Sequence, residues 1–151
     1  MLMKLKSSGI LKKKPRAGKG KENKQKTAMK ILIVEDEQVL SKVLKEKFEK
    51  AGFETKVSGD GEVAISDSKS FLPDIIVLDL VLPKKSGFEV LKAVKADPET
   101  KGIPVIVVSN LGEDSDIKQA LSLGAKDYFV KSQHPINEII EKVKIAITES
   151  R

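Results

Sequence analysis

The chain has 151 residues, of which 40% are hydrophobic and 33% are charged. Such a composition is typical of a soluble globular protein with a single core. The absence of cysteine excludes a disulfide framework and a thiolate metal site. No apolar run reaches the length of a membrane span, and nothing near Met1 resembles a secretory signal, so we expect a cytoplasmic protein.

The formal net charge of +6 is unevenly distributed. Residues 1–28 contain ten Lys and Arg and one Glu, whereas residues 29–151 carry a small excess of acidic side chains. The first segment has no aromatic residue and no sustained hydrophobic period, so it is predicted to be a disordered basic tail before one folded domain at 29–151. Two interpretations stay open. The tail is either a solubilising extension, with Met29 as a natural beginning, or a weak, nonspecific arm for nucleic acid or another anionic surface.

Beyond the tail, the hydrophobic pattern alternates five times between a short strand and an amphipathic helix. The strands are short apolar runs between Gly, Pro or acidic residues, predicted at 31–34, 53–57, 74–79, 103–108 and 128–130. The helices have one apolar face each and are predicted from Val39 to Ala51, from Asp60 to just before Pro73, from Phe88 to Asp97, from Glu113 to Leu123 and from Pro135 to Ile147. Such alternation predicts an α/β fold, a doubly wound parallel sheet with helices on both faces.

The run Ile75–Leu78 indicates where function is expected. Four consecutive apolar residues between Pro73 and Pro83 are too few for a helix and fit a central strand that is buried on both faces. The carboxyl ends of parallel strands open on a ligand-binding crevice, and Asp79 lies at that end. A carboxylate in such a place must be paired, hold a metal or take part in chemistry, because burying it alone is costly.

Other polar side chains follow the neighbouring strands at the same end. They are Glu35 and Asp36 after the first strand, Ser109 after the fourth and Lys131 after the fifth. Carboxylates that meet in one crevice repel one another, and a divalent cation relieves the repulsion; ligation by oxygen alone favours Mg²⁺. A cation, an ammonium and a hydroxyl can together surround the oxygens of a phosphoryl group in transfer, and an Asp can itself accept that group.

Four motifs, in this order and on these elements, closely resemble the receiver domain of bacterial two-component response regulators. They are Val34–Glu37, Val77–Pro83 with Gly87, Val107–Ser109 and Asp127–Lys131. The resemblance covers roughly residues 30–148. It implies a flavodoxin-like fold with the strand order 2-1-3-4-5, an order that is carried over from the family.

The resemblance implies a role for each residue of the crevice. Asp79 would be the phosphoacceptor, taking its phosphoryl group from a phosphohistidine. Mg²⁺ would be bound by Asp36, Asp79 and the backbone carbonyl of Val81, and Glu35 would hold a metal-bound water. Lys131 would contact the phosphoryl oxygens.

Two further residues would form the switch. Ser109 would also contact the phosphoryl oxygens and move toward the phosphate, and Tyr128 would turn inward to fill the space. The implied protein is a single-domain response regulator rather than an enzyme, with a sensor histidine kinase or a phosphotransfer protein as its partner. Phosphorylation would change its contacts with an unidentified target, through the fourth predicted helix, the fifth strand and the last helix. A phosphorelay intermediate, a phosphate sink and a binding module that acts through the tail stay open as alternatives.

The chain departs from the family pattern in three places. Ser132 follows the lysine where the family usually has a Pro with a cis bond, so a cis bond is not expected here. Asn110 takes the place of the commoner Ala, with an effect that the sequence leaves open. Ser109 replaces the commoner Thr and keeps the hydroxyl.

Self-dephosphorylation is expected to be slow. Hydrolysis of an acyl phosphate needs a water aligned opposite the leaving carboxylate, and the residues two beyond Asp79 and two beyond Ser109 should flank its path. These residues are Val81 and Leu111, and neither can orient a water.

Simpler explanations exist for single residues. Glu35 and Asp36 could cap the following helix. Tyr128 could serve only in packing, and His134 is most simply a loop or cap residue. A haloacid-dehalogenase-like phosphohydrolase also uses a strand-end Asp, but it needs a second Asp at the position of Val81. A nucleotide-binding enzyme needs a glycine loop after the first strand, where this chain has acidic residues.

Overall fold

The computed structural model describes residues 28–149, which form five strands, five α-helices and one 3-10 turn. The strands are β1 (Lys30–Val34), β2 (Glu54–Ser58), β3 (Ile75–Leu78), β4 (Val105–Ser109) and β5 (Asp127–Val130). The helices are α3 (Gln38–Lys50), α4 (Gly61–Phe71), α5 (Gly87–Ala96), α6 (Asp114–Ser122) and α7 (Ile136–Glu149), and the turn is η1 (Lys131–Gln133). The predicted basic tail at 1–28 lies outside the described residues, apart from Ala28.

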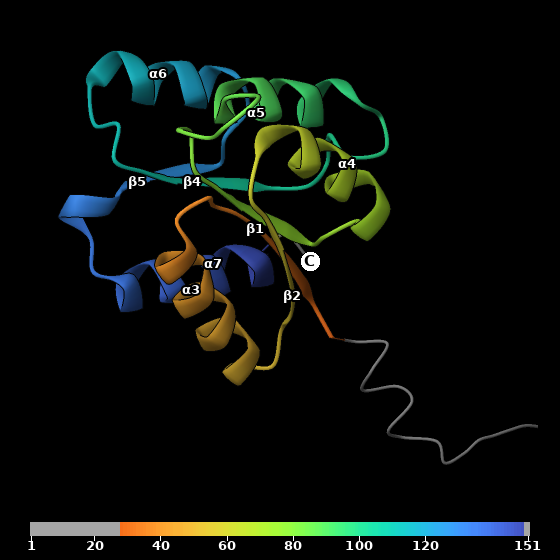
Figure 1. Ribbon diagram of the computed structural model, residues 1–151, viewed down its shortest axis with the longest axis vertical. Helices are drawn as coiled ribbons and strands as arrows, with labels where there is room; N and C mark the ends of the chain where they lie inside the picture. Colours follow the sequence, from red (N-terminus) through yellow and green to blue (C-terminus); the bar gives the residue numbers. More distant parts are fainter. Residues whose placement is uncertain (1–27, 150–151) are drawn as a thin grey trace, which may run out of the picture.

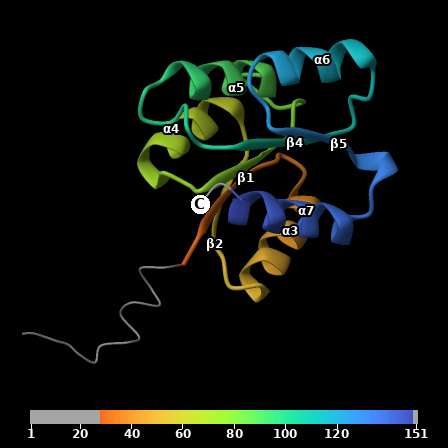
Figure 2. The same ribbon diagram turned by 180° about the vertical axis from the view of Figure 1, so that it is seen from behind.

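The strands form one parallel sheet in the order β2-β1-β3-β4-β5, which confirms the predicted α/β fold and its strand order. Helices α4, α5 and α6 cover one face of the sheet, and α3 and α7 cover the other (Figure 1). The view from behind shows the same two layers (Figure 2). Among the described residues, no helix is long and apolar enough to cross a membrane.

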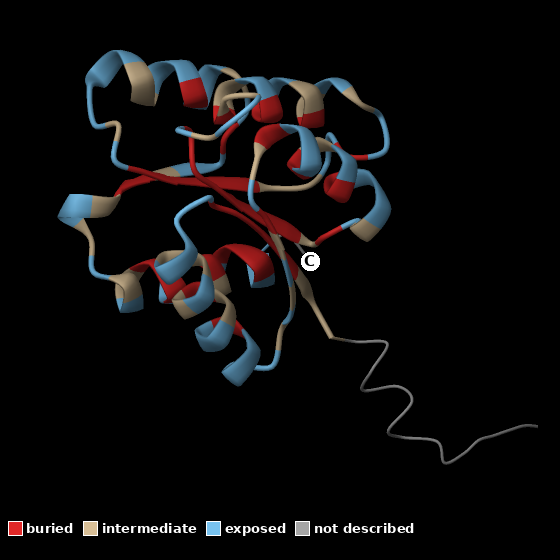
Figure 3. Cartoon of the chain, viewed as in Figure 1, coloured by how far each residue is buried: buried red, intermediate tan, exposed pale blue. Residues whose placement is uncertain are grey.

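The sheet has a buried layer of side chains on each face. In β1, Ile31 and Ile33 belong to the layer under α3 and α7, whereas Leu32 and Val34 belong to the layer under α4, α5 and α6. Successive side chains of a strand point to opposite faces, so a strand covered on both sides must be apolar throughout. Each such Ile or Leu contributes about 2 kcal/mol by leaving water. The central strands are accordingly buried along their length (Figure 3).

Local signals set the ends of the helices. The Asp60 carboxylate caps α4 by accepting from the Val63 N–H at 2.8 Å, as predicted. Ser86 and Glu89 form a reciprocal capping box at the start of α5, which the sequence analysis missed although the Ser-x-x-Glu spacing is visible. Strand β4 starts directly after Pro104 and not at residue 103, because the proline ring has no N–H to give to the sheet.

Candidate functional site

The carboxyl ends of β1, β3 and β5 bring three predicted residues together. Glu35 follows β1, Asp79 follows β3 and Lys131 follows β5. The Lys131 Nζ lies 2.9 Å from Glu35 Oε1 and 3.1 Å from Asp79 Oδ2. Glu35 and Asp79 are 4% and 5% exposed, so this bridge is almost removed from water and its charges interact more strongly than surface pairs do.

The second oxygen of each buried carboxylate is held by the backbone. The Glu37 N–H donates to Glu35 Oε2 at 3.1 Å, and the Val81 N–H donates to Asp79 Oδ1 at 3.2 Å. With Lys131 on the other oxygen, each carboxylate is fixed from two sides. The site is therefore oriented before any ligand arrives.

Asp36 completes an acidic cluster. One carboxylate oxygen each from Glu35, Asp36 and Asp79 can be chosen so that all three lie within 4.8 Å of one another. Asp36 is exposed, which leaves one side of the cluster open to solvent. Three carboxylates against one ammonium leave a negative site of oxygen donors, and this donor set fits a hard divalent cation.

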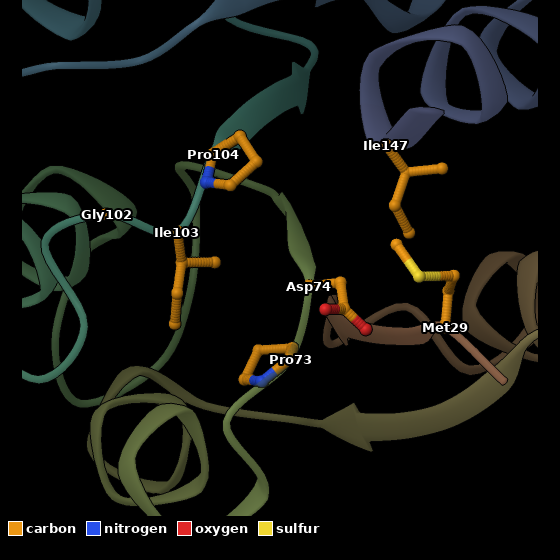
Figure 4. Close-up of a pocket in the computed structure, with 7 residues that line it drawn as sticks. All are labelled: Met29, Pro73, Asp74, Gly102, Ile103, Pro104 and Ile147. Carbon is orange, nitrogen blue, oxygen red and sulfur yellow. The ribbon is translucent and has the colours of Figure 1, made fainter. Parts of the chain in front are cut away.

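A cavity of about 320 Å³ lies over this cluster. Its lining consists of Glu35, Asp36, Glu37, Asp79, Val81, Asn110 and Lys131. Asn110, whose effect the sequence left open, therefore faces the same space as the carboxylates. A second cavity, of about 210 Å³, lies at the amino ends of the strands, opposite the first, between Met29, Asp74 and Ile147 (Figure 4). The Asp74 carboxylate there accepts from the Lys30 N–H at 2.8 Å, which gives Asp74 a structural role at the start of β1.

The predicted switch residues are joined through Leu111. Ser109 is fully buried and its Oγ accepts from the Leu111 N–H at 3.3 Å. The Tyr128 hydroxyl donates to the Leu111 carbonyl. The expected roles of these residues toward a phosphoryl group stay predictions. The lining of the cavity includes neither Ser109, which is buried, nor Leu111, which packs against the core under α4, α5 and α6.

Residues 31–144 match the family model described as the response regulator receiver domain. The chain belongs to the response regulator receiver family. The phosphate regulon transcriptional regulatory protein PhoB of Rhizobium meliloti is 35% identical over 122 residues, which make up 81% of this receiver chain and 53% of PhoB. The receiver chain spans about half the length of the curated relatives it matches.

Two solved structures of response regulators are similar to this chain in both sequence and fold. The Mn(2+)-bound form of response regulator Rcp1 is 28% identical, with a TM-score of 0.69 over 77% of this chain and 91% of that one. The phosphorylated cyanobacterial phytochrome response regulator RcpA is 32% identical, with a TM-score of 0.67 over 78% and 90% of the two chains. Receiver domains are phosphoacceptor modules of two-component signalling rather than enzymes.

Burial and charge shift the proton equilibria of the receiver site. Burial raises the pKa of Glu35 to about 6, and Asp79 adds to this shift while hydrogen bonds from Lys131 and Glu37 oppose it. Burial alone would lower the pKa of Lys131, but its contacts with Glu35 and Asp79 outweigh burial and raise the pKa. Lys131 therefore stays charged at neutral pH, whereas Glu35 takes up a proton at a higher pH than an ordinary glutamate does.

Glu35→Gln is expected to change how stability depends on pH in metal-free buffer. The pKa of Glu35 rises from 4.5 in the unfolded chain to about 6 in the folded receiver, so the folded state binds more protons between these values and stability falls as pH rises through them. The difference in unfolding free energy between variant and parent should grow by up to about 2 kcal/mol in favour of the variant from pH 4.5 to pH 7. Urea unfolding at several pH values measures it. The exposed Glu62→Gln is the control, and a difference that stays constant with pH would contradict the prediction.

The chain makes a short turn directly after β5. Residues 28–149 contain no cis peptide bond, and Lys131, Ser132 and Gln133 form the turn η1 instead. His134 follows this turn, with its Nδ1 at 3.0 Å from Glu138 Oε2 and its ring edge-on to Phe129. Its position agrees with the loop residue expected from the sequence.

Gly87, which belongs to the motif around Asp79, has a steric role. A Cβ on Gly87 would lie 2.3 Å from the Asp79 carbonyl oxygen and 2.5 Å from the Leu80 Cα. The Gly87 N–H donates to the Leu80 carbonyl at 2.9 Å. Only glycine allows α5 to begin this close to the backbone of Asp79, so Gly87 fixes where that backbone lies.

Proposed function

We propose that this receiver accepts a phosphoryl group on Asp79 from the phosphohistidine of a sensor histidine kinase or phosphotransfer protein, with Mg²⁺ as cofactor. The observation that carries the proposal is the buried bridge from Lys131 to Asp79 and Glu35, with Asp36 beside it at an open cavity. A merely structural ion pair does not need two further carboxylates, which add repulsion. Acceptance of a negatively charged group requires positive charge, which Lys131 and a cation held by these carboxylates would supply together.

The transfer exchanges one bond to phosphorus for another. An Asp79 carboxylate oxygen forms a bond to phosphorus as the phosphorus–nitrogen bond of the donor breaks, and the imidazole nitrogen keeps the electron pair and takes a proton from solvent. The Lys131 ammonium already lies beside Asp79 Oδ2 and neutralises part of the charge on the transferred oxygens. Glu35, Asp36, Asp79 and the Val81 carbonyl would hold the cation, which supplies the remaining positive charge when bound.

The solved relatives support both parts of this proposal. Rcp1 has been solved in a Mn(2+)-bound form, and RcpA has been solved in a phosphorylated form. Both structures share this fold over most of their length. Two proteins of this fold, 28% and 32% identical to this chain, have thus been observed with a divalent cation and with a phosphoryl group.

Output would follow from movement of Ser109. The Leu111 N–H donates to Ser109 Oγ, and the Leu111 carbonyl accepts from the Tyr128 hydroxyl. A Ser109 that moves toward a phosphoryl group would break the first bond, and Leu111 would pass the movement on to Tyr128. We place the responding surface on α6, β5 and α7. Leu121 on α6 and Ile145 on α7 are 46% and 53% exposed and would each offer an apolar contact to a partner.

Phosphorylation by a small donor tests the proposal directly. Phosphoramidate and Mg²⁺ should add one phosphoryl group to the unmodified receiver, measured by intact mass spectrometry. Asp79→Asn should add none, because an amide is a poor nucleophile, whereas the exposed Asp114→Asn should be modified like the parent. Chelation of the cation should suppress the reaction. Equal modification of Asp79→Asn and the parent would refute the proposal.

A further inference from the structure

The loop between Asp79 and α5 is anchored at two points by helix N-termini. The Gly87 N–H of α5 donates to the Leu80 carbonyl at 2.9 Å. The Gly61 N–H of α4 donates to the Pro83 carbonyl at 3.1 Å. The first N–H groups of a helix have no partner within the helix, so loop carbonyls satisfy them here. Val81, whose carbonyl is a proposed cation ligand, lies between the two anchors.

The second anchor leaves no space for a side chain. Gly61 is buried, and a Cβ on it would lie 2.0 Å from the Lys85 carbonyl oxygen and 2.6 Å from the Lys85 Cβ. The nearest atom belongs to the backbone, so the clash cannot be relieved by rotating a side chain. Gly59, two residues earlier, has nothing within 4 Å of its Cβ position. The requirement for glycine is therefore specific to the residue that meets the loop.

The loop itself has a conformation that needs such support. Lys84 has a φ of +69°, in the left-handed region that favours glycine. The Lys85 N–H donates to the Pro83 carbonyl at 2.8 Å, so that carbonyl accepts from the loop as well as from α4. The Lys84 Nζ also lies 3.8 Å from Asp60 Oδ2, at the cap of the same helix. A strained backbone conformation persists only where surrounding contacts stabilise it, and here the contacts come from the start of α4.

We propose that Gly61 is a positioning residue for the cation site, acting through the loop that carries Val81. Because Gly61 has no side chain, the start of α4 can pack directly against residues 83–85. This packing would fix the position of the loop, and with it the position of the Val81 carbonyl relative to Asp79. The inference rests on the proposed function, because it assumes that a divalent cation binds beside Asp79.

Mn²⁺ binding tests the inference in the full chain. Free Mn²⁺ is counted by electron paramagnetic resonance while the protein is titrated, and circular dichroism follows unfolding of each variant. Gly61→Ala should weaken Mn²⁺ binding about tenfold, the usual effect of losing a group that orients a metal ligand. Gly59→Ala, the matched control, should bind like the parent. Phosphorylation of Gly61→Ala should be slow at low Mg²⁺ and recover at saturating Mg²⁺, at a temperature where circular dichroism shows that the variant is folded at both concentrations.

Each outcome decides between the two proposals. A folded Gly61→Ala that binds Mn²⁺ as tightly as Gly59→Ala would overturn the positioning role and leave the proposed function standing. A parent protein that binds no Mn²⁺ would overturn both.

A measurement without substitution covers the case in which Gly61→Ala fails to fold. In amide NMR spectra of the parent, Mg²⁺ should shift the Gly61 resonance with the same Kd as the Val81 resonance. The chemical shift of Gly102, which lines the cavity at the amino ends of the strands, should not change. A Gly61 resonance that does not respond to Mg²⁺ would also overturn the inference.

Discussion

Lys131→Met should lower the free energy of unfolding by about 3 kcal/mol in metal-free buffer at pH 7. Met keeps the length and apolar character of the lysine stem but removes the ammonium that lies 2.9 Å from Glu35 and 3.1 Å from Asp79. Two nearly buried carboxylates are then left facing each other without a cation. Removing one partner of a buried ionic cluster is costly because the remaining charge stays desolvated. Denaturant unfolding of parent and variant measures the loss.

Two conditions should reduce this loss, and they identify its cause. Added Mg²⁺ should restore stability by replacing the missing positive charge between the carboxylates. Lowering the pH should do the same, because Glu35 takes up a proton more readily once Lys131 no longer opposes the effect of burial on its pKa. The exposed Lys126→Met serves as the control and should leave stability nearly unchanged. A Lys131→Met protein as stable as the parent without metal would show that the bridge carries no such energy.

The fold was predictable because its signals are local. Each strand is a short apolar run, each helix has one apolar face, and a parallel sheet brings all the carboxyl ends of its strands to one edge. That rule places Glu35, Asp79 and Lys131 together without knowledge of any distance. The helix cap at Asp60 follows from the same kind of nearest-neighbour pattern.

Contacts between segments far apart in the chain were not predictable. The clash that makes Gly61 necessary involves Lys85, and nothing in the sequence around either residue announces that α4 meets this loop. The direction of a loop side chain is equally hidden. Val81 and Leu111 occupy matching positions after two strands, yet Val81 faces the cavity and Leu111 packs against the core. Backbone geometry decides between these outcomes, and no hydrophobic period exists over so few residues.

This asymmetry sharpens the expectation for the lifetime of the phosphorylated receiver. Val81 is 55% exposed and lines the cavity, so it is the residue of the two that faces an incoming water. Hydrolysis requires the water oxygen to form a bond to phosphorus as the phosphorus–oxygen bond to Asp79 breaks, which regenerates the carboxylate. An apolar side chain cannot align that water, so the parent should lose its phosphoryl group slowly.

Val81→Asn should speed this loss about tenfold, less than a full general base would achieve, because an amide can orient the water but cannot take its proton. The decay is followed by intact mass spectrometry after removal of phosphoramidate. Val63→Asn, the same substitution at a residue of α4 that is 42% exposed, should decay like the parent. Leu111→Asn should accelerate decay less than Val81→Asn does, because its side chain starts outside the cavity. Loss of the phosphoryl group from the parent within seconds would show that water is aligned by some other group.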